Sequence, residues 1–278
     1  MPRVFFITGC STGLGKSYAQ YVLQRGDYCV ATARNKDQLL SFKGATEQNF
    51  LPLALDVMDK ASITAGFSAA LAKFSRIDVV VNNAGYGLAG CFEEYDEAQI
   101  RQQMEVNFFG LIDVTREALR IMRTKNSPPG GVIQQVTSIG GQRGVAGFSL
   151  YCASKWAVEG MSEAISKELR PEWNIKVTCV EPGSFRTDWT GRSMTFAPRM
   201  PEYDHLDIKK SMDERHGTQA GDPDKGARAM YDLALMPNPP VRVAIGEDSY
   251  NLIMKKLQEY EENYKAYKEL SCSTNYDN

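Results

Sequence analysis

Residues 4–15 read VFFITGCSTGLG, a short apolar run followed by a turn that contains three glycines. The run has the length and composition of a strand that is buried on both faces. A helix-like stretch follows directly, so the order is strand, glycine-rich turn, helix. Glycines let a backbone approach a ligand closely, and a helix N-terminus attracts phosphate groups. We therefore expect a phosphate-binding turn, with a plain strand-to-helix turn as the alternative.

Short apolar runs and longer helix-like segments alternate along most of the chain. The helix-like segments lie near 14–25, 60–74, 96–124, 150–169 and 223–235. The apolar runs are Val4–Thr8, Tyr28–Ala33, Phe50–Leu55, Asp78–Asn82, Gly131–Thr137, Lys176–Val180 and Val241–Ile245. This alternation predicts an α/β fold with a doubly wound parallel sheet of seven strands. We expect one domain over 1–278, with a substrate-loop insertion at 184–222 and a C-terminal helix and tail at 247–278.

Composition and charge exclude several classes of protein. The 278 residues are 43% hydrophobic and 24% charged, as in ordinary globular proteins. A formal net charge of -2 argues against a basic nucleic-acid-binding surface, and no apolar segment is long enough to span a membrane. The six cysteines are scattered and no export signal precedes them, which predicts a reduced, cytoplasmic protein. With two histidines in the chain, a histidine-rich metal site is not expected.

The end of the second apolar run bears on the choice of a nucleotide cofactor. Dinucleotide-binding folds that use NAD carry an acidic residue there, which binds the ribose 2′-hydroxyl. Here Ala33 takes that place and Arg34 follows. An arginine can hold a 2′-phosphate through forked, charge-assisted hydrogen bonds, whereas an acid would repel it. We therefore predict NADP(H) over NAD(H). The alternative is that Arg34 is an ordinary solvated charge.

Candidate catalytic groups lie between residues 82 and 155. Tyr151 and Lys155 are spaced i, i+4 and share one helical face. An ammonium beside a tyrosine favours the phenolate, so such a pair can exchange a proton near neutral pH. Most such pairs are ordinary helix neighbours, but Ser138 and Asn82–Gly85 also end predicted strands, where open α/β sheets place ligands. Asn107, among apolar residues, is either a core amide or a site residue.

Taken together, these motifs resemble the short-chain dehydrogenase/reductase family. They occur in the family's order and run through almost the whole chain. The stretch Glu181–Thr187 is more similar to the branch that contains 17β-hydroxysteroid and retinol dehydrogenases. The resemblance implies a Rossmann-type sheet and an oxidoreductase. The motifs are Thr8-Gly9-x-x-x-Gly13-x-Gly15, Asn82-Asn83-Ala84-Gly85, Asn107, Ser138, Tyr151-x-x-x-Lys155 and Pro182-Gly183.

The resemblance also implies roles for single residues. Tyr151 would protonate a carbonyl oxygen as hydride arrives, and Ser138 would hydrogen-bond that oxygen. Lys155 would favour the tyrosinate and bind the nicotinamide ribose. Asn107 would hold, through its backbone, a water in the proton relay to Lys155. The residues implied to contact the cofactor are Gly9, Ser11, Thr12, Gly13, Leu14, Gly15, Arg34, Asp56, Val57, Asn83, Ala84, Gly85, Tyr151, Lys155, Pro182, Gly183 and Thr187.

The predicted function is the reversible, NADPH-dependent reduction of a ketone or aldehyde to an alcohol. One alternative is a biosynthetic enzyme for a steroid, polyketide or imine intermediate, and another is a cofactor-binding regulator without turnover. The lid residues either contact an apolar substrate or pack the lid onto the body. These are Trp189, Met194, Phe196, Met200 and Tyr203, with Val145, Phe148 and Tyr95 as further candidates for the pocket border.

Other residues carry weaker expectations. His205 and His216 are expected to be surface residues, and Cys152 is expected to serve packing rather than nucleophilic catalysis. The two long helices near 96–120 and 151–169 are rich in apolar residues, and in relatives these helices pair between subunits. They predict a homodimer or homotetramer, unless core packing alone explains the pattern. The acidic tail Tyr260–Asn278 either wraps the body, docks on a neighbour or is solvated.

Overall fold

The computed structural model describes residues 2–276. Seven strands pair in parallel in the order β3-β2-β1-β4-β6-β7-β9, so the predicted doubly wound sheet is confirmed. The strand order reverses between β1 and β4, where open α/β sheets form a binding crevice at their carboxyl ends. The strands are β1 Val4–Ile7, β2 Tyr28–Ala33, β3 Phe50–Ala54, β4 Val79–Asn82, β6 Gly131–Val136, β7 Ile175–Pro182 and β9 Arg242–Ile245.

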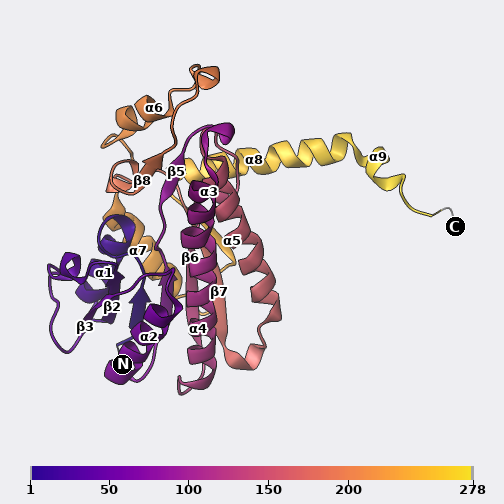
Figure 1. Ribbon diagram of the computed structural model, residues 1–278. Coiled ribbons are helices and arrows are strands. Elements are labelled where there is room, and N and C mark those ends of the chain that lie inside the picture. Colours follow the sequence, from indigo (N-terminus) through magenta and orange to yellow (C-terminus); the bar gives the residue numbers. More distant parts are fainter. Residues whose placement is uncertain (1, 277–278) are drawn as a thin grey trace.

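Helices cover both faces of this sheet (Figure 1). Alternate residues of each strand enter opposite cores, which explains why the runs are apolar throughout: Phe5 packs with one helical layer and Phe6 with the other. One layer consists of α1 Gly13–Gln24 and α7 Pro223–Ala234. The opposite layer consists of α2 Lys60–Phe74, α4 Gly110–Thr124 and α5 Ser149–Glu168.

The single helix expected over 96–124 is interrupted. α3 Glu97–Met104 ends in a π-helical turn, η3 Glu105–Phe109, before α4 begins. Inside this turn, the Asn107 amide donates to the Tyr86 carbonyl and accepts from the Tyr86 N–H, both at 3.0 Å. Such turns often mark functional sites, and this one depends on a contact with a distant loop. Helical periodicity does not register such a contact, so the sequence predicted one continuous helix.

The insertion at 184–222 contains more regular structure than its composition indicates. It holds η6 Asp188–Thr190, β8 Met194–Phe196, η7 Pro201–Tyr203 and α6 Ile208–Arg215. β8 pairs in parallel with β5 Gly87–Ala89, the segment that follows β4. This second, two-stranded sheet holds the insertion as a lid over the carboxyl edge of the main sheet (Figure 1). Short helical turns also occur at η1 Lys36–Leu39, η2 Phe92–Glu94, η4 Ile139–Gly141 and η5 Pro171–Trp173.

The C-terminal segment does not wrap around the body in its described part. α8 Glu247–Ala266 starts against β9 and then extends away from the molecule, followed by α9 Lys268–Cys272 (Figure 1). Ser249 is its buried residue, and the last two residues of the predicted tail lie outside the described range. Among residues 2–276, no helix is both long and apolar enough to cross a bilayer.

Candidate active site

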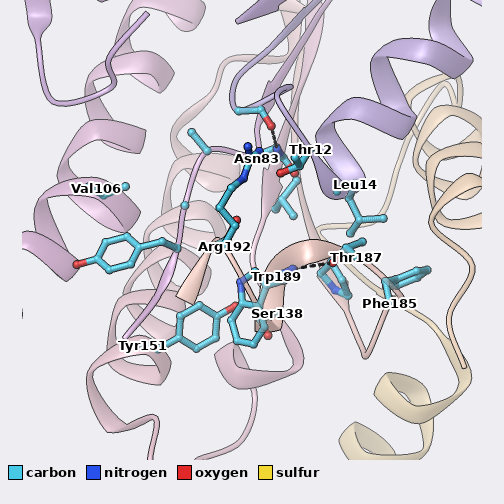
Figure 2. A pocket seen from close by; sticks show the side chains of 18 of the residues that line it. Thr12, Leu14, Asn83, Val106, Ser138, Tyr151, Phe185, Thr187, Trp189 and Arg192 are labelled. Carbon is cyan, nitrogen blue, oxygen red and sulfur yellow. Dashed lines mark hydrogen bonds between the residues drawn. The ribbon is translucent and has the colours of Figure 1, made fainter. Parts of the chain in front are cut away.

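An elongated cavity of about 600 Å³ runs along the carboxyl edge of the main sheet. Its walls come from the segments that follow β1, β2, β4, β6 and β7, together with the lid (Figure 2). The volume lies within the usual range for small-molecule and cofactor sites. It includes the point where the strand order reverses, between β1 and β4.

The glycine-rich turn after β1 forms one end of this cavity. Gly9 and Gly13 have φ angles of 71° and 59°, and a Cβ on Gly9 would lie 2.8 Å from the Ala84 Cα. α1 begins here without a side-chain cap on Thr12 and without an acidic residue in its first turn. The first amide N–H groups of α1 therefore remain available to an anion. This donor set fits the pyrophosphate of a dinucleotide.

A network of hydrogen bonds joins this turn to the loop after β4. The Thr8 hydroxyl oxygen accepts from the backbone N–H groups of Asn83 and Ala84, both at 3.0 Å. The Asn83 side-chain amide donates to the carbonyls of Thr8 and Gly9 at 2.9 and 3.0 Å. Gly15 packs directly against the backbone of the same turn. A Cβ on Gly15 would come within 2.4 Å of the Gly9 carbonyl oxygen, so the site has no room for a side chain. The two loops thus form one preorganised wall.

Arg34 lies at the far end of the cavity, just after β2. It is exposed and has neither a hydrogen-bond nor an ion-pair partner within residues 2–276. Gln38 and Asp56 line the same end, where Asp56 accepts the Met58 N–H at 3.0 Å. A guanidinium without an acidic partner can bind a phosphate group. The role of Arg34 in binding a 2′-phosphate stays a prediction.

Ser138, Tyr151 and Lys155 line the cavity together, and Figure 2 shows Ser138 and Tyr151 beside Trp189. The Ser138 oxygen accepts the Gly140 N–H at 3.0 Å, which holds it at the start of η4. The Lys155 ammonium donates to the Val136 carbonyl at 2.9 Å and lies 5.8 Å from the centre of the Tyr151 ring. Both α5 side chains are almost completely buried. Their common face is the one expected from the i, i+4 spacing.

Burial dominates the proton affinities of this pair. It raises the pKa of Tyr151 to about 12, against a smaller lowering by a hydrogen bond with Ser138. It also lowers the pKa of Lys155 to about 8, opposed by the charge of Glu159. The pKa of Tyr151 is therefore raised rather than lowered, because desolvation by burial is the largest influence on it. Tyr151 is protonated at neutral pH and is suited to donate a proton.

Asn107 lies behind the cavity rather than in its lining. Besides its two bonds to Tyr86, its amide donates to the Ser154 hydroxyl at 3.3 Å. A Cβ on Gly85 would be 3.1 Å from the side-chain oxygen (Oδ1) of Asn107 and 3.7 Å from the side-chain nitrogen (Nζ) of Lys155. Asn107 and Lys155 therefore approach the same point in the loop after β4. Gly15 and Asn107 are the predicted site residues that do not line the cavity; the remainder do.

The segment after β7 completes the wall. Gly183 donates its N–H to the Ile245 carbonyl at 2.9 Å, and the Thr187 hydroxyl accepts from the Trp189 N–H at 3.3 Å. The Trp189 ring lies 5.4 Å from Tyr151 and 6.2 Å from Phe148, centre to centre. These aromatic groups give the substrate end an apolar surface, to which Val145 also contributes.

Some residues considered for the pocket border lie outside the cavity lining. Tyr95 is buried beside the cavity and donates to the Gly90 carbonyl. Of the five lid side chains, Trp189 lines the cavity, whereas Met194, Phe196, Met200 and Tyr203 do not. Met194 and Phe196 instead pack the lid onto the body, which is the second of the two alternatives for the lid residues.

Other lining residues carried no signal in the sequence. Arg192, Arg215, Gln102 and Met212 line the cavity but come from the irregular lid or from the polar face of a helix. Neither periodicity nor a motif identifies such positions. The lid residues reach the cavity through contacts between distant segments, such as the pairing of β5 with β8.

The histidines and Cys152 behave as expected. His205 and His216 are exposed and lie outside the cavity lining. Cys152 lines the cavity, but burial raises the pKa of its thiol, so it is not a thiolate at neutral pH. All six cysteines are free.

Comparisons with known proteins agree with this geometry. A family model described as short chain dehydrogenase matches residues 3–196. An uncharacterized oxidoreductase from Schizosaccharomyces pombe is 38% identical over 96% of this chain and 90% of its own length. A 3-ketodihydrosphingosine reductase from Bacteroides thetaiotaomicron is 32% identical, with 88% of each chain covered. The crystal structure of a short-chain dehydrogenase from Streptomyces avermitilis superposes with a TM-score of 0.90 at 32% identity, covering 99% of this chain and 100% of the other.

Proposed function

The chain belongs to the short-chain dehydrogenase family and is an oxidoreductase, and from this premise we propose that it reduces a ketone or aldehyde to an alcohol with NADPH, reversibly. The observation that carries the proposal is a buried tyrosine beside a serine hydroxyl and a lysine ammonium, in the wall of the cavity of about 600 Å³ along the carboxyl edge of the sheet. A relative named as a 3-ketodihydrosphingosine reductase supports carbonyl reduction.

Each residue of the site has a step that its geometry permits. When bound, NADPH supplies the hydride. Tyr151 donates its phenolic proton to the carbonyl oxygen of the substrate, and the Ser138 hydroxyl donates a hydrogen bond to the same oxygen while negative charge develops there. The Lys155 ammonium stabilises the tyrosinate that remains, until a proton returns to Tyr151. Asn107 holds the loop after β4, which Lys155 also approaches, in a fixed position.

The substrate and the cofactor occupy opposite ends of the cavity in this proposal. Trp189, Phe148 and Val145 favour a substrate with an apolar group beside its carbonyl. Arg34 supports NADPH as the cofactor, because its guanidinium has no acidic partner among the described residues and directly follows β2, where NAD-using folds carry an acid. A neighbouring fold of 25% identity, an alcohol dehydrogenase from Thermococcus sibiricus, was solved with 5-hydroxy-NADP.

Substitution of Tyr151 by phenylalanine tests the function. We expect kcat for NADPH oxidation with a panel of ketones and aldehydes to fall about 100- to 10,000-fold, the usual contribution of a general acid. The affinity for NADPH, measured by its fluorescence on binding, should change far less than kcat, because the Tyr151 hydroxyl is one of many groups that line the cavity.

Tyr250→Phe provides the matched control, since this tyrosine is 57% exposed on α8. Its turnover should equal that of the wild type. Retained turnover in Tyr151→Phe would refute the role of Tyr151. NADPH binding without turnover of any carbonyl compound by the wild type would instead favour a cofactor-binding regulator.

A further inference from the structure

Arg192 lies on the lid side of the cavity and has no polar partner within residues 2–276. Arg192 lines the same cavity as Thr12 and Asn83, and Figure 2 labels all three. Those two residues belong to the preorganised wall at the start of α1. An arginine that lines a cavity without an acidic partner requires either solvent or an anionic ligand.

The other basic side chains of the cavity lining are committed elsewhere. Lys155 donates to the Val136 carbonyl, and Arg215 donates to the Ser184 hydroxyl at 2.9 Å. Arg34 lies at the opposite end, after β2. A bound pyrophosphate carries two negative charges, whereas the dipole of α1 offers only about half a positive charge. Among the basic residues of the lining that face this end, Arg192 has no hydrogen-bond or ion-pair partner among residues 2–276, so it is free to contribute to this charge balance.

The backbone around Arg192 is fixed to the body of the protein. The Ser193 carbonyl accepts the Gly87 N–H at 2.9 Å, in the register that pairs Gly87 with Met194. Trp189 packs on the same glycine, where a Cβ would lie 2.8 Å from the indole ring. The position of the Arg192 Cα is thus set by β5, which follows directly from the loop after β4.

We propose that Arg192 binds the pyrophosphate of the nucleotide cofactor from the lid side, opposite the N-terminus of α1. This inference rests on the proposed function and extends it, because it makes the lid part of the cofactor site. A bound cofactor would then hold segment 188–193, including Trp189, over Tyr151.

Equilibrium binding of NADPH and NADH to the full-length chain tests this proposal. R192Q should weaken both nucleotides by about tenfold, the effect of losing one charge-assisted contact. Their affinities should also depend less on salt concentration in this variant. R192K should lie between R192Q and the wild type. Adenosine 2′-monophosphate, which has no pyrophosphate, should bind R192Q and the wild type equally.

R199Q is the matched control on the same lid. The Arg199 guanidinium pairs with Asp204 and Asp207 at 3.0 and 3.1 Å and lies outside the cavity lining, so its loss should leave nucleotide binding unchanged. Equal nucleotide affinity in R192Q and the wild type would overturn the inference. A loss of affinity restricted to NADPH would also overturn it, because it would indicate a contact with the 2′-phosphate. A change restricted to the KM of acidic substrates would overturn it as well. If the wild type bound neither nucleotide, the proposed function itself would fail.

Discussion

At the scale of single residues, the choice of cofactor depends on one charge. Arg34→Asp reverses that charge at the end of β2. We expect the affinity for NADPH to fall at least tenfold, because an aspartate repels the 2′-phosphate and the charge-assisted hydrogen bonds are lost. The affinity for NADH should be preserved or improved, since the acid can accept from the ribose hydroxyls. Fluorescence titration with each nucleotide measures the ratio.

Lys36→Asp makes the same charge change two positions away. Lys36 is exposed in η1 and does not line the cavity, so this control should change both affinities by a small and similar factor. A preference for NADPH that survived in Arg34→Asp would show that Arg34 is a solvated surface charge.

Residue-level motifs made much of the site predictable, because they combine glycines and polar groups whose placement follows from the strand ends. The glycine-rich turn, Ser138 and the Tyr151–Lys155 pair line the cavity as expected. Arg192 was not predictable, since its position depends on the β5–β8 pairing and not on a local pattern. The proton affinity of Tyr151 was also misjudged, because a sequence shows the neighbouring lysine but not the degree of burial.

At the scale of elements, a buried pair of carboxyl groups joins α5 to β7. The Glu159 carboxylate is 4% exposed and pairs with Arg242 of β9 at 3.0 Å, while Glu181 accepts from the Gln142 amide at 2.8 Å. Burial and the charge of Glu159 raise the pKa of Glu181 to about 7. Arg242 thus pairs with both Glu159 and Glu163, and its charge also acts on Glu181.

This pair gives the fold a dependence on pH with a defined sign. Between about pH 4.5 and 7, folded Glu181 holds a proton that the unfolded chain has released, so stability falls as the pH rises through this window. Glu181→Gln removes the titration while its side-chain carbonyl can still accept from Gln142. We expect the melting temperature of the wild type to drop more between pH 5 and 8 than that of the variant, as followed by circular dichroism.

Glu163→Gln is the control for this experiment. Lys167 and Arg242 lower the pKa of Glu163 to about 2, so its contribution to stability is present above about pH 4.5 and is lost below that value. The variant should therefore retain the wild-type decrease between pH 5 and 8. An equal decrease in the wild type and in Glu181→Gln would contradict the assignment.

Elements of regular pattern were predictable to within a residue or two, as the agreement for β2 and α2 illustrates. A continuous apolar run indicates a strand that is buried on both faces, and helical periodicity indicates a helix that is buried on one face. The π-helical turn η3 was not predictable, because Asn107 holds it through Tyr86 in another loop. The same reason applies to β5 and β8. Each strand has only three residues, and each depends on pairing with the other, which lies far away in the sequence.

At the scale of the whole molecule, self-association remains a prediction. Phe109 and Trp156 are 47% and 40% exposed, at the start of α4 and on α5. Apolar side chains on these helices would be removed from water in a symmetric dimer, at about 25 cal/mol for each Å² buried. We expect light scattering at micromolar concentration to give a multiple of the 31.0 kDa chain mass. Phe109→Ser with Trp156→Ser should lower that mass, whereas Leu40→Ser, at 69% exposure in the distant η1 region, should not.

The projecting helix α8 offers a competing surface that the same measurement distinguishes. Tyr250, Met254 and Leu257 are about half exposed and spaced i, i+4 and i+7, so they form one apolar stripe on a helix that extends from the body. Deletion of 250–278 should leave the number of chains in the assembly unchanged if α4 and α5 form the interface. A monomeric deletion variant, with Phe109→Ser and Trp156→Ser still associated, would assign the contact to α8. A monomeric wild type would contradict both interfaces and leave core packing as the reason for the apolar character of the two long helices.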